Sequence, residues 1–163
     1  MKKIIVLGVG NLLLADEGIG VRAVEQFERQ YRLPPGVEVI DAGTAGMEML
    51  EALEYLDHLI IVDCARFNKP PATVFVLHDE EVPSFFKIKI SPHQLGISDV
   101  LGSLIFVGRQ PKGLSLIGIQ PKTIETGMDL TPEVAALIPE IVGQIVSELR
   151  AIGVEVEENA ACA

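Results

Sequence analysis

The chain has 163 residues, 48% of them hydrophobic, which is the size and composition of one domain with a buried core. Its formal net charge of −10 disfavours nucleic acid and anionic membranes as partners, because both are negatively charged. No apolar run is long enough to span a bilayer or to form the core of a signal peptide, so we expect a cytoplasmic protein.

Short apolar runs alternate with helical patterns along the chain. The sequence predicts strands at residues 4–7, 37–40, 59–62, 73–77 and 114–119, and helices at 19–31, 47–56, 95–106 and from 131 onward. This alternation is typical of an α/β fold with a mostly parallel sheet covered on both faces. The third and fourth strands are joined without a helix by a segment too short for a parallel crossover, so one of them is predicted to be antiparallel.

Two prolines mark the last helical pattern. Thr131-Pro132-Glu133 has a capping residue followed by proline at the first helical position, which is typical of a helix start. Pro139 is expected to divide this helix, because proline fits a first turn but not a helix interior. We expect one domain over residues 1–152 and an acidic, frayed tail at 153–163.

The first loop imitates a dinucleotide-binding motif. Gly8-Val9-Gly10 follows the first strand, and Asp41 follows the second. However, Leu13 stands where the third glycine of the motif belongs, and Asp16-Glu17 would repel a pyrophosphate. The pattern therefore argues against a dinucleotide site.

The two cysteines, Cys64 and Cys162, form no C-x-x-C pair, which excludes a cysteine-based zinc knot. Cys64 follows the third strand and could act as a nucleophile with His93. A lone cysteine at a strand end is more often a small packed residue, and we favour that interpretation.

Three residues could form a metal site: Glu17 after the first strand, Asp63 at the end of the third, and His93 at a predicted helix start. If the first and third strands are neighbours, both carboxylates lie at the same sheet edge. Two carboxylates and an imidazole suit zinc or nickel and leave positions open for water or substrate. Simpler interpretations also remain: a helix cap for Asp63, a complement to a helix N-terminus for Glu17, and a surface position for His93.

A second loop, Asp41-Ala42-Gly43-Thr44-Ala45-Gly46, is predicted at the same edge. Its glycines indicate positive φ angles or close approach to another chain. Asp41 could act as an acid or base or position a peptide. An ordinary strand-to-helix turn capped by Asp41 is the alternative.

Several motifs together resemble those of the hydrogenase maturation endopeptidases. They are Gly8-x-Gly10-Asn11-x-Leu13-x-x-Asp16-Glu17-Gly18-x-Gly20, Asp41-Ala42-Gly43-Thr44-x-Gly46, Asp63 after an apolar strand, Ser91-x-His93-Gln94, Gly118-Ile119-Gln120-Pro121 and Thr126-Gly127-x-x-Leu130-Thr131-Pro132-Glu133-Val134. The resemblance runs from about residue 3 to residue 150 and is greatest to the proteases of nickel-iron uptake hydrogenases.

The resemblance implies a three-layer α/β/α fold, phosphorylase/hydrolase-like, with a mixed, mostly parallel five-stranded sheet. The implied activity is removal of a C-terminal extension from the nickel-loaded large-subunit precursor of a hydrogenase. By the same resemblance, Glu17, Asp63 and His93 contact nickel carried by the precursor, and Asp41 is catalytic or recognises the substrate. A monomer without a tightly bound organic cofactor is expected. Ala42 departs from the family pattern, where glycine is common.

Two other functions remain open at this stage. The chain could be a metal-sensing chaperone that binds the precursor without cutting it, or a dinucleotide-binding oxidoreductase. The cleavage chemistry is open as well: water could attack a metal-polarised carbonyl, or carboxylates could provide acid/base catalysis without a metal.

Overall fold

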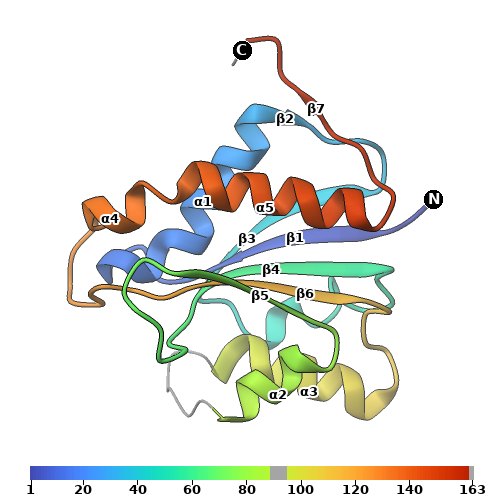
Figure 1. Ribbon diagram of the computed structural model, residues 1–163. Helices are drawn as coiled ribbons and strands as arrows, with labels where there is room; N and C mark the ends of the chain where they lie inside the picture. Colours follow the sequence, from blue (N-terminus) through green and yellow to red (C-terminus); the bar gives the residue numbers. More distant parts are fainter. Residues whose placement is uncertain (89–94, 162–163) are drawn as a thin grey trace.

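The computed structural model describes residues 1–88 and 95–161 (Figure 1). The elements in chain order are β1 (Ile4–Val9), η1 (Ala15–Gly18), α1 (Ile19–Gln30), β2 (Tyr31–Arg32), β3 (Val37–Gly43), η2 (Met47–Met49), β4 (His58–Cys64), β5 (Val74–His78), α2 (Glu81–Ile88), α3 (Leu95–Val107), β6 (Leu114–Ile119), α4 (Pro132–Ala135), α5 (Ile138–Ala151) and β7 (Glu157–Glu158). The two 3₁₀ helices are η1 and η2.

The central sheet has five strands in the order β3-β1-β4-β6-β5. Its first four strands are parallel, and β5 pairs with β6 in the antiparallel sense. The sequence prediction of one antiparallel strand among 59–62 and 73–77 is thereby confirmed, and the antiparallel member is the later one. The expectation that the first and third strands are adjacent in the sheet is also confirmed, because β1 pairs with β4.

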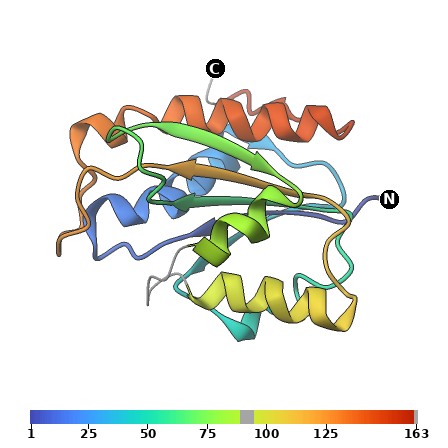
Figure 2. The same cartoon turned by 60° about the horizontal axis from the view of Figure 1, so that its bottom comes forward.

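Helices cover both faces of the sheet, which gives the predicted three-layer α/β/α arrangement (Figures 1 and 2). Along β1, Ile4 and Val6 pack with α1 and α5 in one apolar cluster, whereas Ile5 and Leu7 belong to the cluster of α2 and α3. Successive side chains of a strand point to opposite faces, so an uninterrupted apolar strand supplies both cores.

The helix predicted at residues 47–56 is wrong. The structure has only the 3₁₀ turn η2, followed by hydrogen-bonded turns that end at Tyr55 with a positive φ of 55°. Leu53 and Leu56 are nevertheless fully buried against the α2/α3 face. The apolar spacing thus predicted which side chains are buried, but not that their backbone forms an irregular series of turns.

The helical elements near the end of the chain follow the two prolines. Thr131 is the N-cap of α4, and Pro139 stands in the first turn of α5. The predicted division of this helix is therefore confirmed. Residues 81–88, which lie outside the predicted elements, form α2. The helix start expected at Ser91–Gln94 lies outside the described residues.

The acidic tail, predicted to be frayed, makes contacts with the end of α1 and with β2. Residues 157–158 form β7, which pairs with β2, and Val156 is buried. Asn159 donates its backbone N–H to the carbonyl of Gln30, and its side-chain amide donates to that of Arg29. Asn159 thus supplies donors for two of the last carbonyls of α1, which have no partner within the helix.

Within the part of the chain that the structure describes, no helix is long and apolar enough to cross a membrane.

Candidate active site

The carboxyl ends of the parallel strands form one edge of the sheet. The chain passes from β1 to its neighbour β3 on one side, and from β4 towards β6 on the other. The space between the ends of β1 and β4 is therefore the topological switch point, where open α/β sheets bind their ligands. Val9 of β1 is paired with Asp63 of β4 at this position.

Two glycines allow the loop after β1 to fold tightly onto this edge. Gly10 has a φ of 144°, and a Cβ atom on it would lie 1.9 Å from the carbonyl oxygen of Glu17. A Cβ atom on Gly20, in the first turn of α1, would lie 2.2 Å from the carbonyl oxygen of Val62. These glycines are explained by close packing of η1 and α1 on the strand ends, with no need for a bound phosphate.

Glu17 and Asp63 lie near the same buried thiol. Asp63, at the end of β4, is 3% exposed, and Glu17, in η1, is half-buried. Burial raises the pKa of the Cys64 thiol, and the negative charges of Asp63 and Glu17 raise it further. Because η1 packs against β4, Glu17 and Asp63 lie at the same edge of the sheet. The structure also supports the interpretation of Cys64 as a packed residue, because a buried thiol with a raised pKa is not a thiolate nucleophile.

Asp41 stands on the other side of β1 from Asp63. It pairs with Gly8, and two strand spacings, about 10 Å, separate β3 from β4. Strand alternation places its side chain on the α1/α5 face with that of Val39, whereas Asp63 lies on the α2/α3 face. Asp41 is exposed, and its Oδ1 accepts a hydrogen bond of 2.8 Å from the backbone N–H of Gly43.

The loop after β3 contacts both β1 and α3. The backbone N–H of Gly10 donates to the carbonyl of Gly43 at 2.8 Å. The Cα atom of Gly96, in the first turn of α3, lies 3.4 Å from the position of a Cβ atom on Gly46. The start of α3 therefore lies against this loop. His93 precedes α3 in the sequence and lies outside the described residues.

Asp16, the residue before Glu17, is fully buried. Its carboxylate accepts hydrogen bonds from the backbone N–H groups of Lys122, Thr123 and Thr131 at 3.0, 3.1 and 2.7 Å, and from the Thr131 hydroxyl at 3.0 Å. No separate role was predicted for Asp16 from the sequence. The available signal was that Asp16 and Thr131 both stand within the motifs that carry the family resemblance.

Comparisons with known proteins agree with this architecture. The family model described as hydrogenase maturation protease matches residues 21–148. The hydrogenase 2 maturation protease of Escherichia coli (strain K12) is 52% identical over 154 residues, which cover 94% of each chain. The solved structure of the hydrogenase maturating endopeptidase HybD from E. coli has a TM-score of 0.93 and 49% identity, and the match covers 98% of this chain and 99% of that one.

The chain belongs to the hydrogenase maturation protease family. It is a peptidase that processes a hydrogenase precursor, as the sequence resemblance implied. More distant relatives agree: the HupD hydrogenase expression/formation protein of Rhodobacter capsulatus is 40% identical over 161 residues, which cover 98% of this chain and 77% of that protein. Neither the non-cleaving chaperone nor the dinucleotide-binding oxidoreductase is favoured by these findings.

The contact of Glu17, Asp63 and His93 with a metal ion stays a prediction for this hydrogenase maturation protease. Among residues 1–88 and 95–161, no group of three His, Cys, Asp or Glu side chains is arranged to hold a metal ion. His93, which supplies the imidazole of the predicted set with Glu17 and Asp63, lies outside these ranges. The structure therefore describes two of the three predicted ligands, both at the switch point.

An apolar pocket of about 590 Å³ adjoins the end of β4 in this protease. The residues that line it are Arg66, Phe67 and Asn68, which follow β4, and Leu77, Glu80, Glu81, Ser84 and Phe85 from β5, α2 and the turn between them. Phe67 stacks on Phe75 of β5 with ring centroids 4.7 Å apart and lies 5.2 Å from the ring of Phe85. The segment that leaves Asp63 thus forms one wall of an aromatic hollow.

Proposed function

We propose that this protease removes the C-terminal extension of a nickel-iron hydrogenase large-subunit precursor after nickel insertion. The observation that supports the proposal is the position of Glu17 and Asp63 at the same edge of the sheet, where η1 packs against the end of β4. The similarity to a hydrogenase 2 maturation protease supports a large subunit of that type as the substrate.

In this proposal Glu17, Asp63 and His93 contact the nickel ion that the precursor carries. Carboxylate oxygens and an imidazole nitrogen are suitable ligands for nickel, and three protein ligands leave positions for groups of the substrate. The nickel is part of the substrate, so the protease needs no metal or organic cofactor of its own. The triad would then distinguish a loaded precursor from an empty one.

We assign proton transfer during cleavage to Asp41. Its Oδ1 is held by the N–H of Gly43, and the residue is exposed at the edge to which a peptide has access. A carboxylate there can take the proton from a water molecule that adds to the scissile carbonyl, and return it to the amine as the C–N bond breaks. Asp41 is on the opposite side of β1 from Asp63, which suits separate roles in cleavage and nickel contact.

The remaining features of the proposal concern the whole molecule. Residues 1–152 are proposed to form a single protease domain that acts as a monomer in the cytoplasm. Its partner is the nickel-loaded precursor, with neither nucleic acid nor membrane involved, in keeping with the formal net charge of −10.

The test is to incubate the protease with nickel-loaded and nickel-free precursor and to read the intact mass of the precursor. Loss of a C-terminal peptide from the nickel-loaded sample alone would support the proposal. Cleavage of both samples would overturn the nickel-reading role of the triad, and binding without a change of mass would contradict the assignment of cleavage to this chain.

A further inference from the structure

The buried carboxylate of Asp16 joins two segments that are far apart in the chain. Its donors lie 106 to 115 residues later, in the connection between β6 and α4. β1 and β6 are not neighbours in the sheet, because β4 lies between them. Asp16 therefore links the loops that leave the two strands flanking β4, the strand that carries Asp63.

The backbone around Asp16 makes the same connection. Ala15 donates its N–H to the carbonyl of Gly127 at 2.7 Å, and Gly127 donates to that of Leu13 at 2.9 Å. Leu14 and Gly127 form an isolated parallel β-bridge. The two segments are thus held together by hydrogen bonds on both sides of the carboxylate.

Both oxygens of the Asp16 side chain have to accept hydrogen bonds. Oδ2 accepts from the N–H groups of Lys122 and Thr123, while Oδ1 accepts from the N–H of Thr131. A carboxylate offers two acceptors and no donor, whereas an amide of the same shape has to direct an NH₂ group at one of these fixed donors. The site therefore distinguishes Asp from Asn even though the two side chains have the same size.

Glu17 follows Asp16 directly in η1, and its carbonyl oxygen packs on Gly10. We propose that Asp16 is a positioning residue, whose hydrogen bonds to the β6–α4 connection fix η1 and hold Glu17 at the edge of the sheet where β4 ends. This inference rests on the proposed function, because it assigns to Asp16 the support of the residue that contacts the nickel-bearing substrate.

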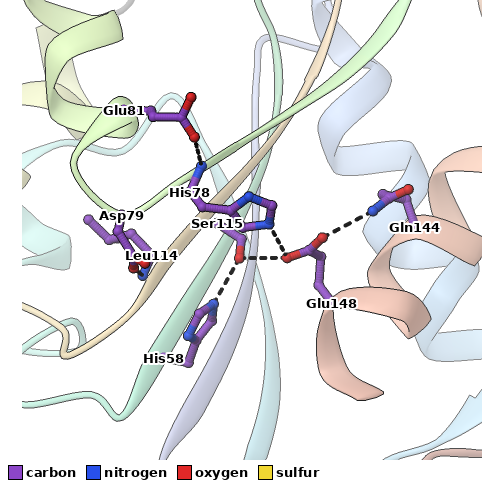
Figure 3. A network of polar contacts seen from close by, with 8 residues as sticks. All are labelled: His58, His78, Asp79, Glu81, Leu114, Ser115, Gln144 and Glu148. Carbon is purple, nitrogen blue, oxygen red and sulfur yellow. Dashed lines mark hydrogen bonds and ion pairs between the residues drawn. The ribbon is translucent and has the colours of Figure 1, made fainter. Parts of the chain in front are cut away.

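Glu148 provides a matched control at the opposite edge of the sheet (Figure 3). Among the residues that the structure describes, Glu148 is, besides Asp16 and Asp63, the third buried acidic side chain, at 7% exposure. Its carboxylate accepts hydrogen bonds from the Ser115 hydroxyl, the His78 imidazole and the Gln144 amide. Loss of its charge perturbs a buried polar network without touching η1.

The experiment compares Asp16→Asn with Glu148→Gln in processing of the nickel-loaded precursor, at a temperature where both variants are folded by circular dichroism. Asp16→Asn is expected to lower kcat/KM by tenfold to a hundredfold, roughly the effect of displacing a group by about 1 Å. Glu148→Gln is expected to stay within about twofold of wild type, because surrounding side chains can reorient. Equal losses in the two variants, or wild-type kinetics for Asp16→Asn, would overturn the inference.

Thr131 supplies a second pair of variants in case Asp16→Asn folds poorly. Thr131→Val removes only the hydroxyl donor, and Thr131→Ser retains it. A several-fold lower kcat/KM for Thr131→Val, restored in Thr131→Ser, is expected. Similar kinetics in both variants would contradict a role for the Asp16 contacts in activity.

A readout on the free protein separates this inference from the proposed function. Amide hydrogen exchange over residues 12–18 and 122–131 is expected to be faster in Asp16→Asn than in wild type or in Glu148→Gln. Unchanged exchange would overturn the anchoring role even if activity fell. Suppose that exchange is faster in Asp16→Asn but that the wild-type protein does not cut the precursor. The anchoring role of Asp16 would then be supported, and the proposed function alone would be rejected.

Discussion

The two edges of the central sheet both bury a carboxylate, but they satisfy it with different donors. At the carboxyl edge Asp16 is bonded by three backbone N–H groups and one hydroxyl, all from the β6–α4 connection. At the opposite edge, the donors to Glu148 from the described part of the chain are all side chains. Hydrogen bonds to backbone N–H groups hold the β6–α4 connection in one conformation. The side-chain hydrogen bonds of Glu148 instead join α5 to β5 and β6, which are regular elements.

This difference predicts that changes at the two edges have different consequences. Substitutions of the exposed or partly exposed site residues at the carboxyl edge should alter activity with little loss of stability. Substitutions in the network of Figure 3 should alter stability, and its dependence on pH, with little loss of activity. The predictions below test this separation.

The largest effect is expected for Glu17→Gln. The variant keeps the shape of the side chain but loses the charge with which Glu17 is proposed to contact nickel. We expect no detectable shortening of the nickel-loaded precursor by intact mass, with a urea midpoint close to that of wild type. Normal processing by Glu17→Gln would remove this residue from the site.

Asp41→Asn should have the next largest effect. The amide oxygen can still accept the N–H of Gly43, so the loop should keep its conformation. An amide cannot take a proton from water, and loss of a general base costs about 10²-fold or more in rate. Single-turnover processing measures this, and a wild-type rate would show that Asp41 takes no part in cleavage.

His58 should make stability depend on pH at the opposite edge. Burial lowers the pKa of His58, and the nearby charges of His78 and Lys2 act in the same direction against the opposing effect of Asp79 and Glu148. Its pKa is therefore lower in the folded than in the unfolded state, and the unfolded state binds more protons between the two values. The free energy of unfolding should fall as the pH drops below about 6.5.

His58→Gln tests this dependence. The Ser115 hydroxyl donates to Glu148, so it accepts from His58 Nε2 at 2.8 Å, and the glutamine amide can replace that donor. Urea unfolding at pH of about 7 and about 5.5 should give a flatter pH dependence in the variant than in wild type. An unchanged slope would show that another group titrates, and a changed processing rate at neutral pH would contradict the separation of the two edges.

The smallest effect is expected for Cys64→Ala. The thiol is buried in the α1/α5 core, and its raised pKa keeps it protonated. Removal of one sulfur atom from a packed core should cost about 1 kcal/mol in the free energy of unfolding. Processing should remain within about twofold of wild type. A large loss of activity in a folded variant would reopen the question of a nucleophilic cysteine.

The sequence predicted the strands better than the turns, for a physical reason. A buried strand such as β6 is a mostly apolar run, interrupted by Ser115 and Gly118, and its ends at Leu114 and Ile119 were predicted from that run alone. The segment 47–56 buries leucines at helical spacing, but the hydrogen bonds that decide between a helix and turns leave little trace in side-chain type.

The same reasoning applies to the site. The placement of Glu17 and Asp63 at one edge follows from parallel strands that end there, so this much could be predicted from the sequence. The contacts of Asp16 could not, because its donors are chiefly main-chain groups of Lys122, Thr123 and Thr131, which every residue except proline possesses. Their identity depends on the path of the chain.

The long sequence separation in the Asp16 contacts has a consequence for synthesis of the enzyme. A nascent chain that has emerged only as far as β6 contains every strand of the sheet, yet it lacks the donors from residues 122 to 131. Contacts between segments so far apart form late, because closing a long loop costs entropy before any bond is made. The protease should therefore acquire a competent Glu17 only near the end of folding, after the sheet itself has assembled.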